Sequence, residues 1–171
     1  MDTRRKARAA RAISQLARVL DEYGIPVWLG GEWGNVSLDP SFRPQESRAL
    51  FFLYADDARE ARRAAEDFDH AVVDISPSGF TTEKGDLLIT WQMLWIDESG
   101  ETISFDDKDC PFVWPSGSFP AERLGVLWGG PLRIVERQAE ALHDRARSQK
   151  RASGQRRSDI SRVKAIIHDR M

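Results

Sequence analysis

A glycine pair at the end of an apolar run marks the stretch of this chain that could do chemistry. The run that begins at Ile25 reaches Gly30 and Gly31, and a third glycine follows at Gly34. Glycine tolerates positive φ and leaves main-chain N–H groups open to a ligand, so this glycine elbow predicts a place where an anionic or carbonyl group approaches the backbone. A plain turn from a strand into a helix is the alternative.

Glu32 lies within the elbow and is the candidate acid or base of the site. Desolvation by neighbouring aromatic rings would suit it to proton transfer without a metal. Its charge would repel a nucleoside triphosphate, by about 4 kcal/mol for unit charges about 4 Å apart at an effective dielectric of about 20. The alternative is a carboxylate that points to solvent from a turn.

Other groups with chemical potential are few. Cys110 is the single cysteine, which excludes an internal disulfide and any multi-cysteine metal site. Asp106, Asp107 and Asp109 lack the spacing and glycine of a calcium loop, so a solvated acidic turn is the preferred interpretation. His70 stands at an element boundary and is expected at the surface or in a cap.

Hydrophobic periodicity predicts the elements that must position the elbow. Helices are expected over residues 4–23, 56–68 and 135–148, with a final helix from Ser158. Strands are expected from Ile25 to the elbow and over 48–54, 70–75, 86–96, 102–105 and 123–128. The continuous apolar run Arg48–Tyr54 is typical of a strand covered on both faces of a sheet.

Composition is typical of one folded domain. The chain has 171 residues, of which 41% are hydrophobic, and a net charge of −2, so nucleic acid is not expected as a partner. No apolar run is long enough to span a membrane and no signal peptide is seen, so the protein is expected to be cytoplasmic, without a membrane partner. We predict a single domain over residues 1–171, with the sheet core at about 1–133 and C-terminal helices at 134–171.

The order of motifs supplies a family resemblance. Residues 16–34 combine an amphipathic helix with a strand that ends in Trp-Leu-Gly-Gly-Glu-Trp-Gly, and Gln155–Ile160 has a basic segment followed by Asp-Ile. Over most of its length the chain resembles the small nucleotidyltransferases that inactivate lincosamide and aminoglycoside antibiotics. The resemblance implies an α/β (α+β) fold, with a central mixed sheet of about five strands flanked by helices and a C-terminal helical pair.

The sequence departs from this family where the metal-binding acids should stand. In the family, an Arg-x-His-x-Asp-x-Asp motif opens the next strand and a third acid lies on a later strand, and these acids hold a divalent ion at the nucleotide. Arg43 matches the arginine of the motif. The following positions are Gln45, Ser47 and Ala49 or, one residue on, Glu46, Arg48 and Leu50. Thr90 or an apolar neighbour replaces the third acid, so we predict no metal site and no cofactor.

The tryptophans complete the predicted site. Trp33 flanks the elbow, and Trp91 lies on the long strand where the third acid would stand. We expect Gly30, Gly31, Trp33, Arg43 and Trp91 to line one pocket, in which Arg43 and the glycine N–H groups fix an anionic or carbonyl group of a largely apolar ligand. Packing in the core is the alternative for both rings.

These features predict a pseudoenzyme, a catalytically degenerate nucleotidyltransferase-fold protein that binds a largely apolar small molecule or transforms it without metal. One alternative is an active antibiotic nucleotidyltransferase, with magnesium and a nucleoside triphosphate, whose metal ligands come from Asp39, Glu46 or Asp86. The other is a non-enzymatic interaction module that uses the arginine-rich terminal helices. Whether the chain is an enzyme stays open at this point.

Overall fold

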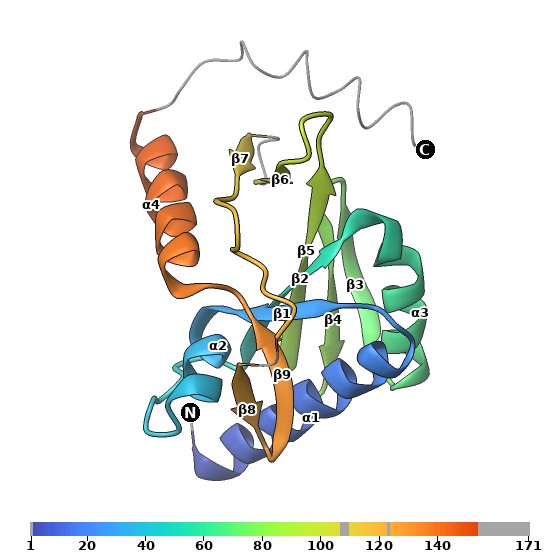
Figure 1. Cartoon of the computed structure of the whole chain (residues 1–171). Coiled ribbons are helices and arrows are strands. Elements are labelled where there is room, and N and C mark those ends of the chain that lie inside the picture. Colours follow the sequence, from blue (N-terminus) through green and yellow to red (C-terminus); the bar gives the residue numbers. More distant parts are fainter. Residues whose placement is uncertain (1, 107–109, 123, 154–171) are drawn as a thin grey trace.

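The computed structural model describes residues 2–106, 110–122 and 124–153, with side chains up to Ser148. Within these residues a mixed nine-stranded sheet carries four α-helices and one short 3₁₀ turn (Figure 1). In chain order the elements are α1 (Thr3–Glu22), β1 (Val27–Gly30), α2 (Gly31–Leu38), β2 (Arg48–Tyr54), η1 (Ala55–Asp57), α3 (Ala58–Asp67), β3 (Ala71–Ser76), β4 (Gly79–Lys84), β5 (Leu87–Ile96), β6 (Thr102–Phe105), β7 (Pro111–Val113), β8 (Gly125–Leu127), β9 (Gly130–Ile134) and α4 (Arg137–Ser153).

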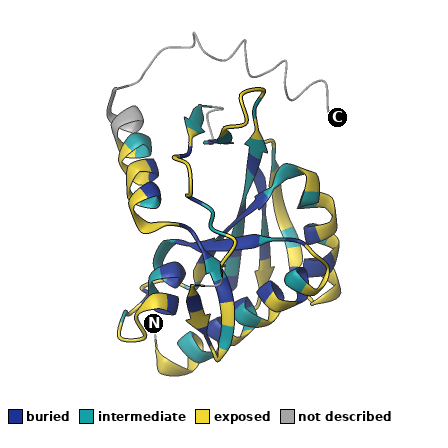
Figure 2. Ribbon diagram, in the orientation of Figure 1, coloured by how far each residue is buried: buried dark blue, intermediate teal, exposed yellow. Residues whose placement is uncertain are grey.

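The sheet places the elbow at its centre. Its strand order is β3-β4-β5-β2-β1-β9-β8, with β6 and β7 continuing from β5. The strand β2 pairs antiparallel with β1 and parallel with β5, which makes the sheet mixed as predicted. Figure 2 shows that these central strands carry much of the buried surface, since both of their faces are covered.

Helices cover one face of the sheet more fully than the other. The larger apolar core joins α1, α2 and α3 to odd-numbered side chains of the central strands, such as Phe51 and Trp91. A smaller core lies on the opposite face, where Trp28, Phe52 and Leu94 meet Trp114 and the first part of α4. Because side chains alternate along a strand, each strand residue belongs to one of these two faces.

Several predictions about the elements are confirmed and others are wrong. The bounds of β2 and β6 coincide with the predicted strands. The expectation of about five strands is wrong. Hydrophobic periodicity predicted one strand near β3 and one near β8, but each of them pairs with a second strand, β4 or β9, in an antiparallel hairpin. The elbow leads directly from β1 into helix α2, as the alternative of a turn from a strand into a helix has it. The final helix predicted from Ser158, with its Asp-Ile segment, lies outside the described residues.

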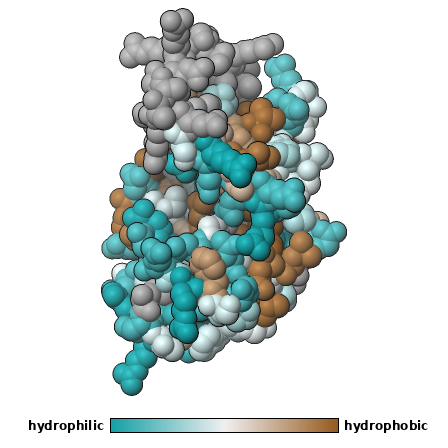
Figure 3. Space-filling model, turned by 90° about the vertical axis from the view of Figure 1, so that its left-hand side faces the viewer, coloured by the Kyte–Doolittle hydropathy of each residue, from teal (hydrophilic) through white to brown (hydrophobic). Residues whose placement is uncertain are grey.

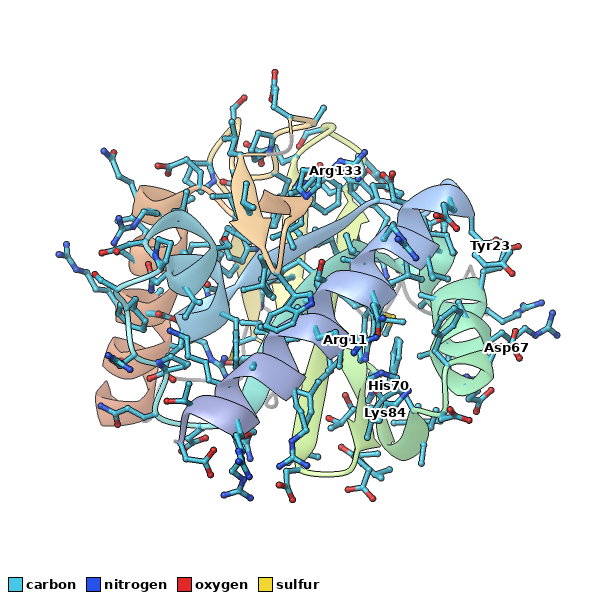
Figure 4. The ribbon with its side chains drawn as sticks, turned by 90° about the horizontal axis from the view of Figure 1, so that it is seen from below. Arg11, Tyr23, Asp67, His70, Lys84 and Arg133 are labelled. Carbon is cyan, nitrogen blue, oxygen red and sulfur yellow. The ribbon has the colours of Figure 1, made fainter. Side chains whose placement is uncertain are left out.

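His70 is not at the surface as expected. Its side chain is buried, and its Nδ1 atom has no hydrogen-bond partner among the described residues. Burial, reinforced by the positive charge of Lys84, lowers the pKa of His70 to about 4. Figure 4 shows His70 beside Lys84, on the side of the sheet that α1 and α3 cover.

No helix in the described part of the chain is long and apolar enough to cross a membrane.

Candidate functional site

The glycine elbow is the turn from β1 into α2. Gly30 ends the strand with an extended backbone, and Gly31 opens the helix at φ +63°. Positive φ disfavours any residue with a side chain, which explains the second glycine. A side chain at Gly30 is disfavoured for another reason, because a Cβ atom there would lie 2.5 Å from Oε1 of Glu140 and 2.8 Å from the ring of Phe52, and these side chains would have to move.

A carboxylate from the far end of the chain occupies the elbow. The N–H group of Gly31 donates a hydrogen bond to Oε1 of Glu140 on α4, at 2.5 Å. This places a negative charge at the positive end of α2, the arrangement that helix N-termini favour. The two residues are 109 positions apart in the chain. The elbow therefore holds a carboxyl group, and this group belongs to the protein itself.

The carboxylate of Glu140 lies in a largely dry environment. Burial raises its pKa, and the N–H group of Gly31 acts in the opposite direction. Asp144 raises the pKa further, whereas His143 and Arg137 lower it. An acid whose charged form is disfavoured by its surroundings is a candidate functional group, because such an arrangement costs stability. Sequence reasoning missed Glu140, since a single glutamate in a charged helix carries no distinguishing pattern.

The sheet face beside the elbow carries none of the acids that the family uses. Gly30, Leu50 and Thr90 are partners in a row across β1, β2 and β5, and Arg48 and Leu88 form the next row. Odd-numbered residues of β2, such as Ala49, pack into the core on the opposite face. Of the two alignments to the family motif, the second, which includes Arg48 and Leu50, therefore places its residues on the face beside the elbow.

These residues do not fit a divalent cation. Magnesium takes oxygen ligands, carboxylates above all, whereas these two rows offer one hydroxyl group, aliphatic side chains and a guanidinium. Within the described residues no three His, Cys, Asp or Glu side chains lie close enough to hold a metal. Two of the three alternative ligands are engaged elsewhere, since Asp39 accepts hydrogen bonds from Ser41 and Asp86 pairs with Arg5 at 2.8 Å, and Glu46 is exposed on the connector before β2.

Aromatic rings fill the space above this face. Phe52 of β2 meets Trp114 and Phe119 edge-on or tilted, with ring centroids 5.2 and 5.6 Å apart. His143 of α4 stacks on Trp114 at 4.7 Å. Trp28 of β1 closes the cluster and donates its indole N–H to the carbonyl oxygen of Pro120 at 2.7 Å. The cleft expected from the resemblance is thus occupied by side chains of the protein.

The structure places Trp33 and Trp91 in the larger core rather than in a pocket wall. Both side chains have 0% exposed surface. Trp91 stacks between Phe51 and Phe80 at about 5 Å, and its indole N–H donates to Thr82 Oγ1 at 2.9 Å. The core alternative therefore describes both rings, and neither offers a surface to a ligand in this conformation.

Glu32 and Arg43 lie at the edge of the site. The carboxylate of Glu32 accepts a hydrogen bond from the backbone N–H of Gln45 at 2.8 Å, and a weaker one from that of Glu46 at 3.4 Å. It thereby ties the connector before β2 to the start of α2. Arg43 is exposed on that connector. A role for either residue with a ligand stays a prediction, as does the binding role of Gly30 and Gly31.

A separate cavity lies at the other end of the central strands. It has a volume of about 290 Å³ and is lined by residues that follow or end β2 and β5, among them Tyr54, Asp57 and Trp95. Burial raises the pKa of Asp57, and the neighbouring charges of Asp56 and Glu60 act in the same direction. The cavity does not include the elbow.

No family model matches the chain, and no curated protein matches it. Solved structures do resemble it. The solution structure of the antibiotic-resistance factor ANT(2'')-Ia has a TM-score of 0.70 at 18% identity, over 91% of this chain and 80% of that chain. Its crystal structure in complex with adenylyl-2''-tobramycin has a TM-score of 0.67 at 20% identity, over 82% of this chain and 76% of that chain. The lincosamide antibiotic adenylyltransferase LnuA, bound to lincomycin, has a TM-score of 0.63 at 12% identity, over 77% of this chain and 83% of that chain. The predicted resemblance is confirmed, and at these identities it establishes the nucleotidyltransferase-type fold.

Proposed function

We propose that this protein is a catalytically degenerate member of the nucleotidyltransferase fold, which binds a largely apolar small molecule at the glycine elbow and does not transfer nucleotides. The fold alone leaves function open, because one fold supports many activities. The proposal therefore rests on the residues around the elbow.

The observation that carries the proposal is the row Gly30, Leu50 and Thr90 with Glu140 above it. A nucleotidyltransferase needs carboxylates that neutralise the triphosphate through a metal ion. Leucine and threonine stand at these positions instead, and the nearest carboxylate contacts the N–H group on which a phosphate would rest. A triphosphate would meet a negative charge there and no metal to offset it.

The aromatic cluster supports an apolar ligand. Phe52 borders the elbow at Gly30, Trp114 and Phe119 pack on its ring, and rings of this kind form the walls of many small-molecule sites. Two of the similar structures contain a small antibiotic or its adenylylated form, as their names state. A compound with an apolar body and one anionic or carbonyl group fits the rings and the N–H group of Gly31.

Calorimetric titration tests the proposal. The protein is titrated with ATP or GTP plus magnesium, and separately, without nucleotide, with lincomycin, which has an amide carbonyl, and with tobramycin, a polycation without a carbonyl group that serves as the contrasting ligand. We expect no heat of binding for either nucleotide. Micromolar binding of a nucleotide with magnesium would instead support an active enzyme with displaced ligands. A matched titration of the variant Leu50→Ala shows whether heat from an antibiotic arises at this face of the sheet.

A further inference from the structure

We propose that α4 is a lid latched onto the glycine elbow by Glu140, and that a ligand reaches the elbow by displacing this carboxylate. The inference rests on the proposed function and concerns the regulation of the same site. It starts from the way α4 is attached to the rest of the molecule.

The start of α4 is fixed and the rest of the helix is held by few side chains. The N–H group of Val135 donates to the carbonyl of Leu29 at 3.2 Å, and that of Glu136 donates to the carbonyl of Ser118 at 2.9 Å. These backbone bonds fix the chain just before the helix begins. A hinge at this point would leave them intact while the helix beyond it moves.

The inward side of α4 is short and partly polar. Within the described part of the helix, Ala139 and His143 are the buried residues, and Glu140 lies between them. Leu142, the large apolar residue of this turn, is 48% exposed. Figure 3, viewed from the side on which α4 and α2 lie, shows hydrophilic residues together with hydrophobic patches on the outward surface. Ala139 packs in the smaller core and the ring of His143 stacks on Trp114, and the hydrogen bond of Glu140 adds a polar contact to this small apolar contact.

The carboxylate is also the group that an incoming ligand must replace. It accepts the hydrogen bond of Gly31, and its Oε1 atom lies so near Gly30 that not even a methyl group would fit between them. A ligand cannot reach this N–H group while Glu140 is seated. A carboxylate on an apolar body matches the displaced group, and the rings that α4 covers would receive that body.

Distances between spin labels test the latch. Labels at Leu142→Cys on α4 and Val126→Cys on β8, both exposed in the native protein, are introduced into a Cys110→Ser background. We expect a single narrow distance distribution for the otherwise native protein and an added, displaced population for Glu140→Ala. An unchanged distribution in Glu140→Ala would overturn the proposal.

Two matched variants separate the latch from general effects of charge. Glu140→Gln keeps an oxygen that accepts the hydrogen bond of Gly31 and is expected to keep the narrow distribution. Asp144→Ala removes an exposed acid of the same helix, whose Oδ1 lies 3.6 Å from Nδ1 of His143, and is expected to leave the distribution unchanged because the ring of His143 still stacks on Trp114. A displaced population of equal size in Asp144→Ala would show that loss of negative charge, not loss of the latch, moves the helix, and would refute the proposal.

Amide NMR tests the displacement step. In Glu140→Ala, sodium acetate is expected to move the Gly31 amide signal in a saturable manner that sodium chloride does not reproduce. Absence of an acetate-specific shift would contradict ligand entry by exchange of carboxylates. Titration of the same variant with ATP and magnesium distinguishes failure of the proposed function from failure of the latch. Nucleotide binding would contradict the proposed function, whereas the label distances test the latch independently.

Discussion

Replacing Gly30 by alanine tests how closely Glu140 is seated against the elbow. The backbone of Gly30 (φ −116°, ψ −169°) suits any residue, so the change causes no backbone strain. The new methyl group would lie 2.5 Å from Glu140 Oε1 and 2.8 Å from the ring of Phe52. Overpacking of this kind typically costs about 1–3 kcal/mol, and we expect Gly30→Ala to lower the free energy of unfolding by about 2 kcal/mol.

A double-mutant cycle isolates the contact with Glu140. In a Glu140→Ala background only the contact with Phe52 remains, so Gly30→Ala should cost about 1 kcal/mol less than in the native protein. Urea unfolding monitored by tryptophan fluorescence measures all four proteins. Gly31→Ala is the matched control: its Cβ atom has no neighbour nearer than 3.9 Å, and its cost of about 1–2 kcal/mol comes from positive φ. Effects of Gly30→Ala and Glu140→Ala that add within about 0.4 kcal/mol would refute the placement of the carboxylate.

Three further predictions concern buried polar groups. Burial raises the pKa of Glu140 above its ordinary 4.5, so the folded protein loses stability as the pH rises from 4.5 through the raised pKa. Glu140→Gln should therefore be more stable than the native protein at pH 7, and this gain should vanish below pH 4.5. A gain that persists at low pH would contradict this cause. The pKa of His70 falls from 6.5 to about 4, so stability is complete above pH 6.5 and decreases towards pH 4, by at most about 3 kcal/mol. His70→Asn should remove this dependence, and an unchanged pH profile would count against it. Thr82→Val leaves the indole N–H of Trp91 without its partner in the core and should cost about 1–3 kcal/mol in urea unfolding, whereas equal stability would show that this hydrogen bond is dispensable.

Local patterns predicted the central strands well. The run Arg48–Tyr54 has the bounds of β2, because a strand buried on both faces is apolar at nearly every position. The face on which each residue lies did not follow from that pattern. Alternation places alternate residues of β5 on one side, yet only the packed structure assigns Trp91 to the side that α1 and α3 cover.

The decisive contact of the site could not be predicted from the sequence. Glu140 reaches Gly31 only because α4 crosses back over the sheet, and neither residue type signals the other. Apolar periodicity predicted this helix, yet its apolar residue Leu142 is 48% exposed and His143 is buried. A helix that buries a carboxylate and an imidazole violates the periodicity rule at the position where it covers the site.

Paramagnetic NMR with Mn²⁺ and ATP tests the central claim most directly, since Mn²⁺ broadens the signals of nearby amides. The account predicts that the amides of Gly31, Leu50 and Thr90 keep their line widths, because their face of the sheet offers no carboxylate ligands and Glu140 occupies the elbow. Selective broadening of these three amides at micromolar Mn²⁺–ATP would contradict it.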